Sequence, residues 1–287
     1  MTEAAIPREF VWRRLHSLMG LCLVLFLTEH LFVNSQAALW LGDNGKGFVR
    51  MVNVIHNLPY RRAIEIFLLG VPFLIHATWG IKYIFTGKSN SRRSDGSLPA
   101  LPDLKRNKAY TWQRITAWIV LIFLIFHVIQ FRFLKYPSSY CDGSSCSYFV
   151  KVSLDDGLYT VADRLGVQLY NLEGIAQQSS NLASKVSFAI PSQGEVVAVA
   201  KDFGTATLLS VRDTFKYPIY VILYTIFVLA VSFHAFNGFW TFLITWGLVL
   251  KMATQRKALA VCMGVMAIII FLGLTAIWGT YWANLRY

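Results

Sequence analysis

The sequence predicts an all-α membrane protein with five transmembrane helices and a small external insertion of mixed strand and helix. Of its 287 residues, 55% are hydrophobic and only 15% are charged, a composition too apolar for an ordinary soluble domain. Five apolar runs are long enough to cross a bilayer, which takes about 20 residues. They lie at residues 15–40, 62–86, 112–134, 217–247 and 258–283.

The basic residues predict the orientation of these spans. Although the net charge of +12 could suggest nucleic acid as a partner, the basic residues lie at span ends, where they orient a membrane protein. They gather before span one, between spans two and three, and between spans four and five. Examples are Arg13, Arg14, Lys88, Arg92, Arg93, Lys105, Arg106, Lys108, Arg114, Arg256 and Lys257. We therefore expect a cytoplasmic N-terminus and an external or periplasmic C-terminus, with no nucleic acid bound.

The chain divides in sequence order into three predicted segments. Residues 1–136 carry helices I to III, residues 137–216 form the external insertion, and residues 217–287 carry helices IV and V. Span one directly follows basic residues and has no small-residue cleavage pattern, which indicates a retained span. The insertion contains alternating stretches, SYFVKVSL and GEVVAVA, and turn signals typical of strands. The polar, basic loop 87–111 is a surface connection suited to anionic membrane lipid or an acidic partner.

The four cysteines do not predict a metal cluster. Cys22 and Cys262 lie within spans, as small apolar packing residues do. Cys141 and Cys146 lie in YCDGSSCSY on the predicted external side, where oxidation is permitted, so a local disulfide is our hypothesis there. Neither pair has C-x-x-C spacing.

Four of the five spans each contain one histidine away from the span ends: His30, His76, His127 and His234. A lone intramembrane histidine can simply bond a carbonyl of a neighbouring helix, but one in each of four consecutive spans indicates a shared function. At 1.5 Å per residue, His30 and His127 lie roughly 20 Å from the inner boundary of the membrane. His76 lies roughly 9 Å from that boundary and His234 roughly 24 Å below the outer one.

These depths predict two pairs, His30 with His127 toward the outside and His76 with His234 toward the inside. A single tetrahedral zinc site would need all four together, whereas two bis-histidine haems fit two layers. The first four spans would then form a haem-binding four-helix bundle, with span five as one peripheral helix.

Several stretches resemble a known family. RRLHSLMG (13–20), EHLFVNSQA (29–37), NLPYRRAIEIFLLGVPFLIHATWGIKYIFTGK (57–88), QRITAW (113–118), FHVIQFRF (126–133) and SFHAFNGFWTFLITWG (232–247) are similar to the single-chain, five-helix, dihaem cytochrome b membrane-anchor subunit of bacterial succinate:menaquinone oxidoreductases and fumarate reductases. The similarity covers spans one to four in order and is weaker in span five. It implies iron ligation by the same four histidines in the same pairs.

The resemblance also implies partners and a pathway. A flavoprotein subunit with FAD would oxidise succinate, and an iron-sulfur subunit on the cytoplasmic face would pass electrons through two haems b to membrane menaquinone. FAD and the iron-sulfur clusters must belong to those partner subunits, because this chain has neither a Gly-rich dinucleotide loop nor a cysteine cluster. The implied location is the bacterial cytoplasmic (inner) membrane, as a multi-pass subunit, and an oligomer of the complex is left open.

Residues near the ligands are candidates for supporting roles. Arg14, His16 and Ser17 at the inner end of span one, with Gln113 and Arg114 at that of span three, are expected to contact haem propionates. For the arginines the alternative is a topology anchor. Glu29 and Glu65 are the acids within spans, and we expect one of them to relay protons at the quinone site, the alternative being a polar residue satisfied by a neighbour.

Two features depart from the family. Ser232 stands where some dihaem fumarate reductases have an acid, which puts a transmembrane proton relay of that kind in doubt, and the segment 137–216 is longer than the family's usual connection. Two other functions stay open. One is the dihaem cytochrome b subunit of a formate dehydrogenase, hydrogenase or nitrate reductase, and the other is a proton-coupled transporter.

Overall fold

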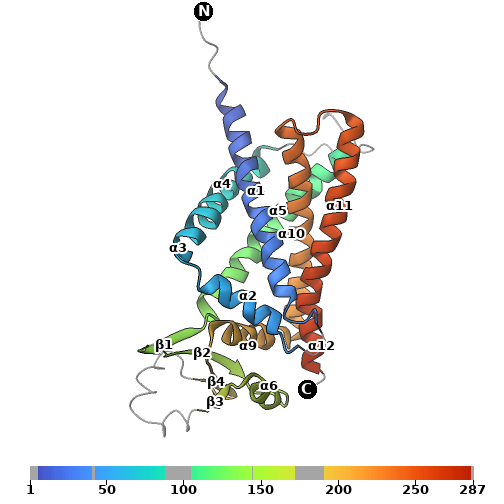
Figure 1. Ribbon diagram of the computed structural model, residues 1–287. Coiled ribbons are helices and arrows are strands. Elements are labelled where there is room, and N and C mark those ends of the chain that lie inside the picture. The colour runs from blue at the N-terminus through green and yellow to red at the C-terminus, as the bar shows by residue number, and fades with distance from the viewer. Residues whose placement is uncertain (1–5, 41–42, 88–104, 144, 172–190, 286–287) are drawn as a thin grey trace, which may run out of the picture. The chain divides into compact units, whose positions relative to one another are not determined.

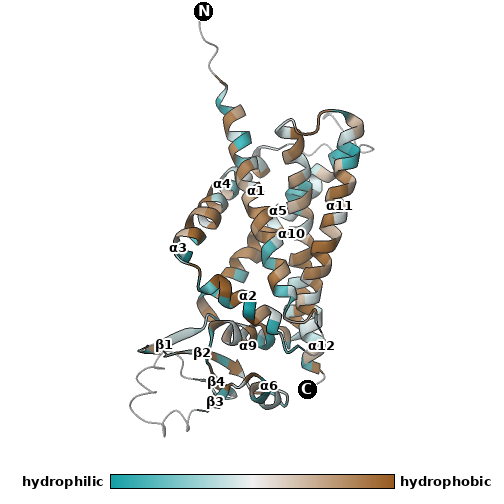
Figure 2. Cartoon of the chain, viewed as in Figure 1, coloured by the Kyte–Doolittle hydropathy of each residue, from teal (hydrophilic) through white to brown (hydrophobic). Residues whose placement is uncertain are grey.

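The structure is a computed structural model that describes residues 6–40, 43–87, 105–143, 145–171 and 191–285. Within these ranges, five helical segments are long and apolar enough to cross a membrane: Arg8–Ser35, Arg61–Thr86, Lys105–Leu134, Pro218–Thr245 and Met252–Leu285. Figure 2 shows apolar residues along most of their length. The predicted five-span architecture is confirmed.

Each spanning segment is built from one or more helices (Figure 1). The bounds are α1 (Arg8–Ser35); α3 (Arg61–Ile64), η1 (Glu65–Gly70) and α4 (Val71–Thr86); α5 (Lys105–Val128) and η2 (Ile129–Leu134); α10 (Pro218–Thr245); and α11 (Met252–Leu274), η3 (Thr275–Gly279) and α12 (Thr280–Leu285). The three η elements are π-helical turns, which occur mostly as short insertions in α-helices.

The helices extend beyond the apolar runs at several ends. The first begins at Arg8, not at residue 15, and the third begins at Lys105, not at residue 112. Once a helix is nucleated, each further residue adds a backbone hydrogen bond, so polar flanking residues continue it. A helix that the sequence analysis did not predict, α2 (Lys46–His56), follows the first span. Its Phe48 side chain is buried, and the helix packs against α9 (Phe203–Phe215).

The contacts divide the chain into two compact units. The first contains residues 1–30, 62–124 and 227–271, and the second contains residues 31–61, 125–226 and 272–287. This division groups packed residues, whereas the predicted boundaries 1–136, 137–216 and 217–287 follow chain order. Those boundaries stay a prediction.

Side chains join the helices of the first unit. The rings of Trp12 in α1 and Trp79 in α4 stack with their centres 4.0 Å apart. Phe123 in α5 and Phe227 in α10 stack at 5.9 Å. The indole of Trp240 in α10 donates to the carbonyl of Gln255 in α11. Members of all five spans therefore share one packed region.

The second unit contains a four-stranded antiparallel sheet within its described residues. The strands β1 (Ser138–Asp142), β2 (Ser145–Ser153), β3 (Gln168–Tyr170) and β4 (Glu195–Ala200) pair in the order β1-β2-β4-β3. Helices α6 (Leu158–Leu165) and α9 (Phe203–Phe215) contribute Leu158 and Leu209 to a core with Val150, Val152 and Ala198. The predicted mixed insertion is therefore confirmed as a small sheet with helices.

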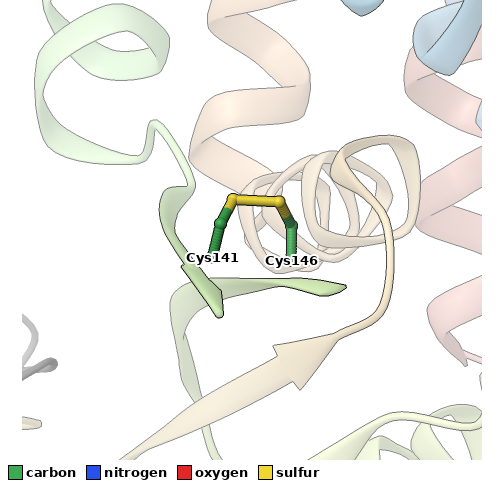
Figure 3. Close-up of a disulfide and its surroundings, with 2 residues drawn as sticks. All are labelled: Cys141 and Cys146. Carbon is green, nitrogen blue, oxygen red and sulfur yellow. A yellow bond between two sulfur atoms is a disulfide. The ribbon is translucent and has the colours of Figure 1, made fainter. Parts of the chain in front are cut away.

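A disulfide joins Cys141 and Cys146 across the β1–β2 hairpin (Figure 3). The two residues are directly opposite each other in the strand register. The local disulfide hypothesised from the sequence is thus present. It closes the end of the hairpin.

A cluster of charged side chains ties α9 to the strands. Arg212 donates two hydrogen bonds to the Asp155 carboxylate, at 2.9 and 2.6 Å. Lys216 contacts both Asp155 and Asp213, at 3.0 and 2.9 Å, and Lys135 contacts Asp213 at 2.7 Å. Burial alone would raise the pKa of Asp155, but hydrogen bonds from Arg212 and Lys216 outweigh it and lower that pKa to about 2.

We expect Asp155→Asn to destabilise the protein by about 2 kcal/mol near neutral pH, because Arg212 loses a charged acceptor in a half-buried site. The folded-state pKa lies below the ordinary 3.8, so the carboxylate stabilises the fold above that value and ceases to do so as pH falls through about 2. Thermal unfolding of the wild type and the variant in detergent should therefore converge as pH falls through that window. A difference independent of pH would contradict this explanation.

Candidate functional site

Two of the predicted ligands lie together in the first unit. His76 projects from α4 and His234 from α10, with their ring centres 6.2 Å apart and their planes at 89°. The pairing inferred from depth along the sequence corresponds to this close approach. Their function as iron ligands stays a prediction.

Both imidazoles are oriented in the same way, by a backbone carbonyl of a neighbouring helix. His76 Nδ1 donates to the carbonyl of His16 in α1 at 3.1 Å, and His234 Nδ1 donates to the carbonyl of Gln113 in α5 at 3.2 Å. A carbonyl oxygen can only accept, so Nδ1 carries the hydrogen in each ring. The other nitrogen, Nε2, then has the lone pair that a metal requires.

The dimensions fit one metal between the rings. Metal–imidazole bonds are about 2.0–2.1 Å long and the ring centre lies about 1.1 Å behind the nitrogen, so two axial imidazoles stand about 6 Å apart. The observed separation of the ring centres, 6.2 Å, is compatible with this distance, and it also lies within the range of edge-to-face ring packing. No group of three or more His, Cys, Asp or Glu side chains suited to a metal occurs in the described ranges. A pair of imidazoles is the protein ligand set of many haems, so these two residues fit a haem.

Small residues expose these two carbonyls. In a helix, the side chain four positions later lies over the carbonyl of a given residue. That position is Gly20 after His16 and Ala117 after Gln113. A Cβ atom on Gly20 would stand only 3.0 Å from His76 Cε1. The absence of a side chain at Gly20 thus allows the His76 ring to reach α1.

His16 also contacts His76 through its own ring. The two imidazoles stack with centres 4.1 Å apart and planes within 10°, and Tyr83 packs edge-on against His16 at 5.5 Å. The Nδ1 atom of His16 is buried and has no hydrogen-bond partner among the described residues. Its neighbour Ser17 is half-buried. The predicted propionate contacts of both residues remain predictions.

Gln113 connects α5 to α10 three times. Besides its carbonyl on the His234 ring, its side-chain amide donates to the His234 carbonyl at 2.9 Å. Its side-chain oxygen accepts from Asn237 at 2.8 Å. These contacts give Gln113 a positioning role that the sequence analysis did not include.

The two predicted arginines have protein partners. Arg114 donates to the carbonyls of Ile84 and Gly87 at the end of α4, at 2.8 and 3.1 Å. The guanidinium of Arg14 lies 3.7 Å from the Phe10 ring centre. Propionate binding by either arginine stays a prediction.

The other predicted pair is divided between the units. His30 belongs to the first unit, where its ring stacks on Phe26 at 5.4 Å. His127 belongs to the second, where its Nδ1 lies 3.3 Å from the Tyr224 hydroxyl. Because that hydroxyl donates to Gln130 at 2.8 Å, it accepts from His127, which again leaves Nε2 with a lone pair.

The two predicted quinone-site acids differ in exposure. Glu29 is exposed at the residue before His30, and Glu65 is half-buried at the start of η1. Their proton relay stays a prediction.

Sequence reasoning missed Trp79, Tyr83 and Tyr224. Trp79 and Tyr83 follow His76 by three and seven residues, which puts them on the same face of α4. That spacing could have identified them, because residues one or two turns from a metal ligand often orient the ligand or contact the cofactor. Tyr224 could not be found in this way because it lies far from His127 in the sequence.

A separate cavity of about 400 Å³ lies in the first unit between α5, α10 and α11. Its lining includes Arg106, Phe236, Trp240, Cys262 and Met263. It contains none of the predicted site residues.

Comparison with known proteins finds a relative along nearly the whole chain. No protein-family model matches the sequence, and no solved structure matches it. The chain is 27% identical over 271 residues to the succinate dehydrogenase cytochrome b558 subunit of Bacillus subtilis (strain 168). The alignment covers 94% of this chain and 96% of that protein. The chain is therefore a distant, full-length homologue of a succinate dehydrogenase cytochrome b558 subunit.

Proposed function

We propose that this chain is the dihaem cytochrome b subunit of a succinate dehydrogenase. In this role it anchors the flavoprotein and iron-sulfur subunits and passes electrons through two haems b to menaquinone. The full-length similarity supports the complex, and the His76–His234 geometry carries the electron-transfer role. Two intramembrane imidazoles that each keep an Nε2 lone pair, at a separation compatible with one iron between them, support haem binding.

Each haem, when bound, supplies an iron that accepts and releases one electron. His76 with His234 would hold the inner haem, and His30 with His127 would hold the outer one. Carbonyls of His16 and Gln113 fix the inner rings, and Tyr224 fixes His127. The apolar helices would exclude water from the bound haems.

The partners and orientation are part of the same proposal. The basic segments would face the cytoplasm, with the N-terminus, and would dock the iron-sulfur subunit. FAD and the iron-sulfur clusters would belong to the partner subunits. The chain would lie in the bacterial cytoplasmic membrane with its C-terminus outside, and Glu29 or Glu65 would deliver protons to the quinone.

The first prediction tests the pairing of ligands. We expect His76→Ala and His234→Ala each to remove the same one of two haems, because one iron loses an axial ligand in either case. His30→Ala and His127→Ala should remove the other. Haem content per chain and the low-spin ferric EPR spectrum measure this. His56→Ala is the matched control and should keep both haems, and loss of the same haem from His76→Ala and His30→Ala would refute the pairing.

The second prediction uses Gly20. Gly20→Ala should lower occupancy of the inner haem, and Gly20→Leu should abolish it, because the new side chain displaces the His76 ring. Gly264→Ala in α11 is the control, since nothing lies within 4 Å of its added Cβ. Alanine favours a helix by about 1 kcal/mol over glycine at either position, so helix propensity alone predicts no haem loss. Equal haem content in Gly20→Leu and wild type would contradict the close approach.

The third prediction concerns the electron donor. In the complex purified with its partner subunits, succinate should reduce haem in this chain, as followed by the visible spectrum. Reduction by formate or hydrogen but not by succinate would assign the chain to another quinone-linked oxidoreductase. A purified chain that binds no haem would favour a transporter instead.

A further inference from the structure

The buried polar atoms of the first unit that have no hydrogen-bond partner among the described residues include three close to His76: His16 Nδ1, Trp79 Nε1 and Tyr83 Oη. An unsatisfied buried donor costs about 1–3 kcal/mol, so such groups are uncommon in a folded protein. Three of them near one another indicate a ligand that satisfies them.

Their positions connect them to His76. Trp79 and Tyr83 lie on the His76 face of α4, roughly 5 and 10 Å further along the helix axis. His16 reaches the same region from α1, stacked on His76 and in edge contact with Tyr83. We call Trp79, Tyr83 and the His16 ring the donor cradle.

The chemistry of the cradle specifies the ligand. An indole N–H can only donate, and a phenol hydroxyl donates strongly, so the ligand must present acceptor oxygens. The nearby Lys82 ammonium lies 5.5 Å from the centre of the Trp79 ring, but it forms an ion pair with Glu9, so the pair adds no net charge to the cradle. A carboxylate, with two acceptor oxygens and negative charge, matches these donors better than a neutral carbonyl.

The scaffold holds the donors in place without such a ligand. Trp79 stacks on Trp12 at 4.0 Å, and Tyr83 contacts the His16 ring. Their polar atoms are therefore directed by ring packing and not by a hydrogen bond. This arrangement resembles a preorganised site, in which little order has to be gained on binding.

We propose that Trp79 and Tyr83, with the His16 ring, bind the propionate carboxylates of the haem that His76 and His234 ligate. This inference rests on the proposed function. It assigns the propionate contacts largely to α4, whereas the sequence alone assigned them to the inner ends of spans one and three.

The test uses Trp79→Phe and Tyr83→Phe, singly and together, in the complete complex. Each variant removes one donor and keeps an aromatic ring for stacking. Trp112→Phe and Tyr110→Phe on α5 are matched controls, because both side chains are largely exposed. The readouts are haem content, the midpoint potential of each haem and the propionate-bending band in the resonance Raman spectrum.

We expect the cradle variants to lower the midpoint potential of the haem that His76→Ala removes, and to leave the other haem unchanged. An uncompensated carboxylate stabilises ferric iron, so losing a donor favours the oxidised state. The propionate-bending band should shift in the same variants. Unchanged potentials and bands with both haems bound would show that water satisfies the three atoms, and would overturn the proposal.

A second measurement covers variants that lose the haem. The haem-free chain is titrated with haem and with haem dimethyl ester, whose carboxylates are blocked. Wild type should bind the ester roughly five- to tenfold more weakly than haem. The double variant should bind haem and the ester with equal affinity, because the interaction requires both the protein donor and the free carboxylate. An equal ester penalty in wild type and double variant would refute the cradle. Absence of haem binding to wild type would instead refute the proposed function.

Discussion

The candidate site depends on one interaction used twice, an imidazole N–H donated to a backbone carbonyl of a neighbouring helix. The carbonyls of His16 and Gln113 each have a second lone pair beyond their place in the helix, and His76 and His234 use it. Because a backbone atom cannot change rotamer, the two rings are oriented by the helices themselves. The pair is therefore as rigid as the packing of α1 on α4 and of α5 on α10.

Side chains around this interaction keep the helices in register. Gly20 lets α4 approach α1. The stacked rings of Trp12 and Trp79 hold the same two helices together about one turn from the His16–His76 contact. Gln113 and Asn237 do the equivalent for α5 and α10 through amide hydrogen bonds. One helix pair is thus fixed by shape and the other by polar contacts. Both solutions satisfy the need to place a polar ring in an apolar region.

The sequence predicted what depends on composition and helical spacing. Apolar runs identified the five spans, and the rise per residue brought His76 and His234 to a common depth. The short strands around Phe149 and Val197 were expected from alternation of apolar residues. Helix α2 was missed because it is short and lies next to a strong span, although Phe48, Val52 and Ile55 have helical spacing.

Other features could not be derived because they depend on tertiary contacts. Nothing local distinguishes Gln113 as a tie to α10, since its partners lie more than a hundred residues away. The unsatisfied atoms of Trp79 and Tyr83 become visible only when every neighbour has been placed. The charged cluster around Asp155 and Asp213 likewise joins residues from three distant segments. Contacts between residues so far apart leave no periodic pattern in the sequence, so they cannot be predicted from one sequence alone.

If His234 ligates haem iron as proposed, the tie formed by Gln113 has a consequence for the rate of electron transfer. When a metal changes oxidation state, its ligands usually move to new positions. That rearrangement slows electron transfer. His234 is held at its ring through Nδ1, at its carbonyl through an amide, and one turn later through Asn237. An imidazole restrained at so many points has little freedom to follow the metal, which would keep the reorganisation energy small and the two redox states nearly superimposable.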